Sequence, residues 1–161
     1  PKGLEMIREI RRRFPMNPLF QFVEVLYLYE SRLPKETAAE AQALLKGIEE
    51  GRKFYEPRFA PRALVGLAGA HFLMKDWAKA EEALSKAVDI LEAHKGHNRW
   101  GLWALIRRGQ VKDARGDRKG ALIDYRRALK HLDYWELHEI AKLHVKRPAV
   151  EKDLDTPIPP P

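Results

Sequence analysis

The sequence predicts an all-helical protein built from helix pairs that stack on one another. Proline and glycine recur along the 161 residues, and the segments between them carry apolar side chains three or four residues apart. This spacing places them on one face of a helix. No stretch alternates apolar and polar residues well enough to predict a strand. A pattern of small and bulky side chains also recurs at a nearly constant interval, which indicates a structural repeat.

Proline positions define the first four of eight expected helices. Pro15 ends the first helix, and Pro18 suits the first turn of the second. Pro34 begins an alanine-rich third helix, and Pro57 and Pro61 precede the fourth. The expected helices cover residues 3–14, 18–31, 34–51, 61–74, 77–93, 99–114, 118–131 and 133–146.

Aspartates mark the starts of three later helices. Asp76, Asp117 and Asp133 each stand where a side-chain oxygen can accept a hydrogen bond from a free backbone N–H of the first helical turn. The segment HKGHN, residues 94–98, predicts a loop between the fifth and sixth helices.

The end of the chain reads PAVEKDLDTPIPPP, in which prolines favour an extended conformation. We therefore expect a helical repeat domain over residues 1–146 and an extended proline-rich tail over residues 147–161. The tail would insert into a groove of a neighbouring copy, carry a sugar on Thr156 in an exported protein, or be a disordered terminus. The candidate self-assembly contacts are Trp135, Pro159 and Pro160.

The repeat consists of a small residue, a bulky apolar residue four positions later, and a small or aliphatic residue three positions after that. It occurs as Gly3-Ile7-Ile10, Ala41-Leu45-Ile48, Ala80-Leu84-Ala87 and Ala121-Tyr125-Ala128, with starts 38, 39 and 41 residues apart. Residues three and four apart are neighbours on a helix, so the small residue lets a partner helix come close and the bulky one fills the gap. Ala68 and Gly109 supply a small residue on two of the expected partner helices.

This pattern resembles the tetratricopeptide repeat family. The residues that carry the resemblance are Leu67, Ala68, His71, Trp77, Ala80, Leu84 and Ala87 in one unit, and Gly109, Gly116, Ala121, Tyr125 and Ala128 in the next. The resemblance covers roughly residues 1–131 and is strongest over residues 61–131. His71 and Lys112 stand where the family usually has an aromatic residue, and the period is longer than the family's repeat of about 34 residues.

The resemblance implies a right-handed α-solenoid of antiparallel helix pairs, with helix 133–146 as a C-terminal cap. The first helix of each pair would line a concave groove, and members of the family are mostly adaptors that bind peptides or proteins there. The first expected helix corresponds to the second helix of a pair. Either further repeats precede it, or its open edge packs on something else.

On the family's geometry, seven residues would face the groove: Phe22, Val65, Gly69, Phe72, Trp103, Ile106 and Gln110. These mostly apolar side chains would suit an amphipathic helix or a hydrophobic peptide. Val65 and Gly69 stand where a clamp for two carboxylates needs lysine and asparagine, so we expect no such clamp. The alternative is that Phe72 and Trp103 pack between helices, as aromatic residues at helical spacing usually do.

No pattern in the sequence predicts a catalytic, cofactor-binding or metal site. Cysteine is absent, which excludes disulfides and thiolate chemistry. His94 and His97 have no carboxylate at zinc-like spacing, and Ser31 and Ser85 lie in helical, charged contexts. No phosphate-binding loop or nucleophile motif occurs. We therefore expect a protein that is not an enzyme.

The net charge of +7 is concentrated in residues 101–150, which contain twelve Lys and Arg and six Asp and Glu. The basic pairs alternate with acidic residues, which favours solvated helix faces over nucleic-acid binding. No apolar run approaches the roughly 18 residues that a membrane span requires. Two functions remain: an adaptor that binds a peptide or protein, which ranks first, and a subunit that assembles head to tail into an oligomer or filament. The sequence does not define a compartment.

Overall fold

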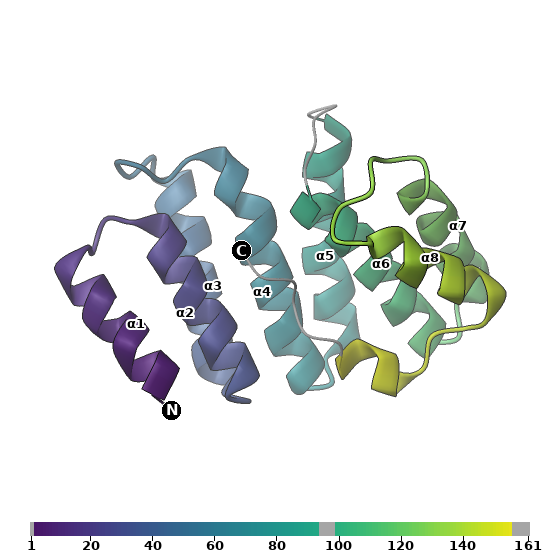
Figure 1. Cartoon of the computed structure of the whole chain (residues 1–161), viewed down its shortest axis with the longest axis horizontal. Helices are drawn as coiled ribbons and strands as arrows, with labels where there is room; N and C mark the ends of the chain where they lie inside the picture. The colour runs from purple at the N-terminus through teal and green to yellow at the C-terminus, as the bar shows by residue number, and fades with distance from the viewer. Residues whose placement is uncertain (1, 94–98, 156–161) are drawn as a thin grey trace.

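The computed structural model describes residues 2–93 and 99–155, which form eight α-helices, two short 3-10 turns and no strand (Figure 1). No helix in these residues is long and apolar enough to cross a membrane. The helices are α1 (Lys2–Arg13), α2 (Pro18–Glu30), α3 (Pro34–Glu49), α4 (Ala60–Leu73), α5 (Trp77–Ala93), α6 (Arg99–Ala114), α7 (Arg118–Ala128) and α8 (Leu137–Lys146), and the 3-10 turns are η1 (Pro57–Phe59) and η2 (Glu151–Asp155).

Side-chain caps position the starts of three helices: Asn17 caps α2, and the predicted Asp76 and Asp117 cap α5 and α7. Asn17 Oδ1 accepts a hydrogen bond from the Leu19 N–H at 3.0 Å at the start of α2. Asp76 Oδ1 accepts from the Lys79 N–H at 3.2 Å, and Asp117 Oδ1 accepts from the Gly120 N–H at 2.9 Å. Each bond satisfies a backbone donor that the helix itself leaves free. The first seven helices accordingly lie within a few residues of the predicted ranges.

The eighth helix begins four residues later than predicted. Trp135 and Glu136 adopt the left-handed backbone conformation, with φ of 54° and 58°, which a right-handed helix cannot contain. Asp133 still satisfies a backbone donor in the first turn of α8, because its Oδ1 accepts a hydrogen bond from the His138 N–H at 3.0 Å. The irregular turn directs the Trp135 ring onto Trp100, with 5.5 Å between ring centroids.

The helices stack in sequence order as pairs: α2 with α3, α4 with α5, and α6 with α7. Within the stack, α2 contacts α4, α4 contacts α6, and α6 contacts α8. These four helices form what we call the inner row; α3 and α5 lie behind α2 and α4 in the view of Figure 1, and α1 lies beside α2. The arrangement confirms the predicted helical repeat, while its right-handed sense stays a prediction.

Small residues allow packed helices to approach closely, both within a pair and between neighbouring pairs. Ala41, Ala80 and Ala121, the first members of three patterns, are completely buried. A Cβ atom placed on Gly66 would lie 2.5 Å from Val25 Cγ1, and one on Gly109 would lie 2.5 Å from the Tyr125 ring. Such distances are too short for carbon contacts, so a larger residue at either position would push the Val25 or Tyr125 side chain out of place.

Helix α6 is the centre of the C-terminal half of the molecule. Every residue from Trp100 to Val111 is buried. The reason is that α4, α5, α7, α8 and η2 all contact α6 and leave none of its faces open. Polar side chains on α6 must therefore find their partners inside the protein.

Candidate interaction surfaces

Arg107 on α6 is a buried cation that binds backbone carbonyl groups. Its side chain is 2% exposed. Its Nη1 donates to the Asp153 carbonyl at 3.2 Å, and its Nη2 donates to the Leu154 carbonyl at 2.8 Å. The guanidinium also lies over the rings of Trp103 and Phe72, with 4.8 and 5.6 Å to the ring centroids. Stacked in this way, the planar group presents its donors in a fixed direction.

Asp113, near the end of α6, is the complementary buried anion. It accepts from Arg118 Nη1 at 3.0 and 3.2 Å and from the Tyr125 hydroxyl at 3.0 Å. It also accepts from the Ala149 N–H at 2.8 Å. Helix α6 thus offers a donor for carbonyl groups and an acceptor for an amide group, and both bind the same short segment of chain. This is the chemistry that recognises the main chain of a peptide.

Residues 147–155, which we call the C-terminal segment, pack against α6 (Figure 1). Ala149 and Leu154 are buried. Residues 151–155 form the turn η2, although the sequence places them in an extended tail. The carboxylate of Asp153 accounts for the difference, because it accepts from both Nη atoms of Arg147 at 2.9 and 3.0 Å and from the Val150 N–H at 2.8 Å.

The contribution of Asp153 to the stability of this turn should change with pH in the acidic range. The pKa of Asp153 is lowered from 3.8 to about 2, chiefly by its hydrogen bond with Arg147; burial opposes this, and the Val150 N–H lowers the pKa further. A lowered pKa in the folded state means that the contribution is complete above pH 3.8 and is lost as the pH falls through about 2. We expect the difference in unfolding free energy between the unaltered chain and Asp153→Asn to shrink over this range. Urea denaturation at a series of pH values measures it, and a constant difference would contradict the role given to Asp153.

The residues predicted to face a groove lie on the inner row, but they are interior. Phe22 on α2, Val65 and Phe72 on α4, and Trp103, Ile106 and Gln110 on α6 are all buried, as is Gly69 on α4. The structure instead fits the alternative that the aromatic side chains fill space between successive pairs. For the three residues on α6, α8 and the C-terminal segment account for the burial because they cover α6, which the repeat pattern alone does not indicate. Contact between these residues and a partner stays a prediction.

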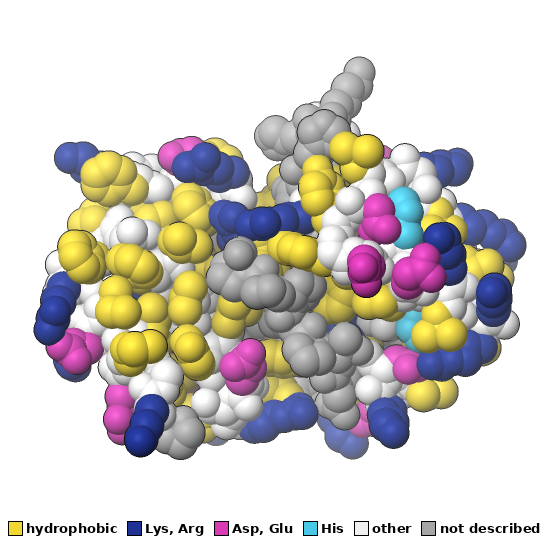
Figure 2. Space-filling model, viewed as in Figure 1, with side chains coloured by type: hydrophobic (Ala, Val, Ile, Leu, Met, Phe, Trp, Pro, Cys, Tyr) yellow, Lys and Arg dark blue, Asp and Glu magenta, His cyan; other side chains and the backbone are white. Residues whose placement is uncertain are grey.

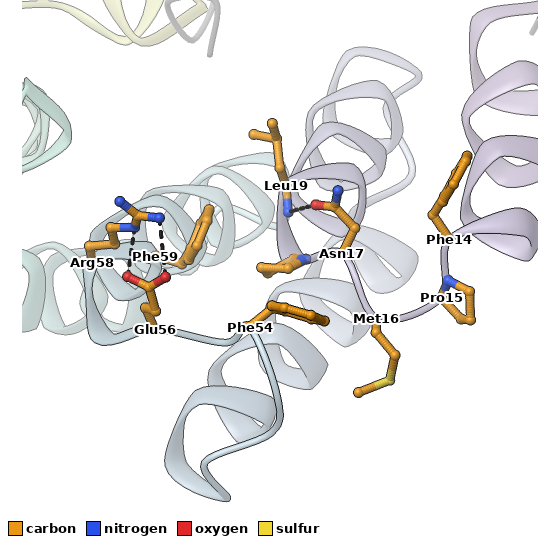
Figure 3. A pocket seen from close by; sticks show the side chains of 10 residues that line it. Phe14, Pro15, Met16, Asn17, Leu19, Phe54, Glu56, Arg58 and Phe59 are labelled. Carbon is orange, nitrogen blue, oxygen red and sulfur yellow. Dashed lines mark hydrogen bonds and ion pairs between the residues drawn. The ribbon is translucent and has the colours of Figure 1, made fainter.

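An apolar cleft of about 510 Å³ lies at the ends of the helices in the N-terminal half (Figure 3). It runs between the connection from α1 to α2 and the connection from α3 to η1. Phe14, Met16 and Leu19 line one part and Phe54 another, and the Phe54 side chain is 59% exposed. Figure 2 shows that hydrophobic side chains also gather over α1 and α2 beside it. An exposed apolar surface of this kind is typical of a contact with another protein.

Of the candidate self-assembly contacts, only Trp135 lies within the described residues. Trp135 is only partly buried and packs against the core beside Trp100, with the Arg99 guanidinium 4.8 Å from its ring centroid. Thr156, Pro159 and Pro160 lie outside the described residues, as do His94 and His97. Among residues 2–93 and 99–155, no three His, Asp or Glu side chains are grouped in a way that could hold a metal ion.

Arg107, Asp113 and Leu154 were not identified from the sequence as binding residues. A signal for Arg107 exists, because it lies four residues after Trp103 and therefore on the same helix face. A signal for Leu154 is its position as a lone large apolar residue in the charged stretch EKDLD. Neither signal indicates that the two residues meet across 47 positions, since that contact depends on the path of the chain after α8.

Comparison with known families supports the repeat architecture. A family model described as a tetratricopeptide repeat matches residues 59–133, which contain α4 to α7. Searches among curated proteins and among solved structures found no match. The matched region includes Arg107 and Asp113 and ends before the C-terminal segment.

Proposed function

Because residues 59–133 of this chain belong to the tetratricopeptide repeat family, we propose that the protein is a scaffold that binds a peptide of a protein partner along its inner row of helices. Repeats of this family generally mediate protein–protein interaction, and the family is typically not enzymatic. The finer proposal concerns the place of binding: the part of α6 that carries Arg107 and Asp113.

The observation that carries the proposal is the pair of hydrogen bonds from Arg107 to the carbonyl groups of residues 153 and 154. Carbonyl groups are common to all peptides, so a side chain that binds two consecutive carbonyl groups of the short turn η2 is suited to peptide recognition. The opposite end of this part of α6 holds an N–H group through Asp113. A partner peptide would use both contacts and place an apolar side chain between them.

Selection of peptides from a random library on the full-length chain tests this proposal. We expect the selected peptides to lose affinity by about tenfold or more when Arg107 is replaced by Lys, since an ammonium group cannot reproduce the two-armed geometry of the guanidinium. Arg126→Lys is the matched control, because Arg126 is exposed on α7 and should not alter binding. Circular dichroism confirms that each variant is folded. Equal affinity for the unaltered chain and Arg107→Lys would refute the proposed site.

A second candidate function is self-assembly, and the apolar cleft beside Phe54 favours it. A neighbouring copy would bury exposed side chains such as Phe14 and Phe54. In that case light scattering should show a mass that rises with concentration and returns to the monomer value in Phe54→Asp. A monomer at every concentration would exclude this function.

A further inference from the structure

The C-terminal segment has the properties of a bound ligand. Its contacts with α6 are of the kind that a separate peptide would make: Arg107 binds two consecutive carbonyl groups, Asp113 binds an amide, and Leu154 is buried in the core. Arg147 and Asp153 close the segment into a compact turn through their own ion pair. The groups that contact α6 through these hydrogen bonds therefore all lie within residues 149–154.

Part of what holds the segment in place is exposed to solvent. Its only regular structure is the five-residue turn η2. The ion pair between Lys75 and Glu151 joins two exposed side chains at 3.2 Å, and exposed pairs contribute little to stability. The pair between Arg147 and Asp153 is also partly exposed. Short segments at the edge of a fold whose ion pairs face solvent can open locally while the rest of the protein stays folded.

We infer that the C-terminal segment is a built-in competitor for the partner peptide, and that the partner presents the same chemistry: an acidic residue followed directly by leucine or a similar aliphatic residue. This inference rests on the proposed function, because it identifies what the inner-row site binds. Displacement of the segment would free the Arg107 donors, the Asp113 acceptor and the space that holds Leu154. In the C-terminal segment, Asp153 fixes the turn that precedes Leu154. The acidic residue of the partner would fix the same turn before its own leucine.

The affinity of the segment as a separate peptide can be bounded. A segment tethered by a short connection has an effective concentration on the order of millimolar. Because the structure has the segment docked, its dissociation constant in trans should not exceed about 1 mM. In the full chain the tethered copy competes, so the apparent affinity of added peptide should equal its intrinsic affinity multiplied by the fraction of time for which the site is open.

The test uses a fluorescein-labelled peptide of residues 147–155 and the full-length chain. We expect the peptide to bind a Leu154→Ser chain at least about tenfold more tightly than it binds the unaltered chain, because the substitution weakens the tethered competitor. Leu132→Ser is the matched control, since Leu132 is exposed before α8 and should leave the competition unchanged. Arg147→Ala provides a second release variant that removes the ion pair with Asp153 and leaves the core intact. Adding Arg107→Lys to the Leu154→Ser chain should abolish binding.

The outcomes separate this inference from the proposed function. If library peptides depend on Arg107 but bind the unaltered, Leu154→Ser and Arg147→Ala chains equally, the site is correct and the competitor inference is wrong. If the labelled peptide does not bind folded Leu154→Ser or Arg147→Ala chains up to about 1 mM, the segment is no ligand and the inference fails. Tighter binding to both release variants, together with its loss on Arg107→Lys, supports it.

Discussion

Replacement of Asp124 by Asn is expected to lower the free energy of unfolding by about 3–5 kcal/mol, the usual consequence of breaking a buried ion pair from one side. Asp124 on α7 is 1% exposed. Its carboxylate accepts from Arg108 Nε and Nη2 at 2.8 and 2.7 Å and from Lys112 Nζ at 2.8 Å. Asparagine has nearly the same shape but no charge, so it leaves two cations on α6 without their buried counter-charge.

Urea denaturation followed by circular dichroism measures this loss. Glu82→Gln is the control, because Glu82 pairs with Lys86 on the exposed face of α5 at 2.8 Å. Such a surface pair is worth less than about 1 kcal/mol, so this substitution should have little effect. If Asp124→Asn behaved like the control, the buried cluster between α6 and α7 would not hold this repeat together.

Replacement of Trp100 by Ala should cost about 3–5 kcal/mol, as is usual for loss of a large buried aromatic side chain. Trp100 on α6 is 2% exposed and contacts two other aromatic rings edge to face. Its ring centroid lies 5.0 Å from that of Phe22 on α2 and 5.5 Å from that of Trp135 before α8. One side chain thus connects three parts of the inner row, and alanine would leave a cavity between them.

The matched control is Leu132→Ala, which removes a large hydrophobic side chain that is 57% exposed. We expect it to change the unfolding free energy by about 0.5 kcal/mol or less, as surface substitutions usually do. Trp100→Ala should also expose the amides of α8 to faster hydrogen exchange, since Trp135 loses its support. A Trp100→Ala chain with the stability of the control would contradict this role.

Local signals in the sequence were sufficient to predict the first seven helices. Pro18 and Pro34 open α2 and α3, and Asp76 and Asp117 cap α5 and α7 as expected. These rules act within one helical turn, so they need no knowledge of the tertiary structure. The start of α8 could not be derived in this way, because the left-handed conformation of Trp135 and Glu136 accompanies packing on the distant Trp100.

The candidate site was predictable only in part. The sequence predicts α2, α4 and α6 on one side of the stack, and the contacts of α4 with α2 and α6 agree with this; α8 also contacts α6, although the sequence predicts it as a cap. The exposure of Phe72 and Trp103 was not predictable, since it depends on what packs over α4 and α6. The charged stretch that contains Leu154 gives little hint that it returns to α6, because its anchors are main-chain carbonyl and amide groups, which every residue has.

The most direct test of the peptide-binding role is the hydrogen exchange of the Ala149 and Val150 amides in the full-length chain, with and without a saturating selected peptide. In the free chain these amides donate to Asp113 and Asp153, and they should exchange more slowly than the exposed backbone. If the partner peptide takes the face of α6 that holds the C-terminal segment, both amides should exchange faster when the peptide is bound. Unchanged exchange at saturation would show that the peptide binds elsewhere and that this face of α6 is not the partner site.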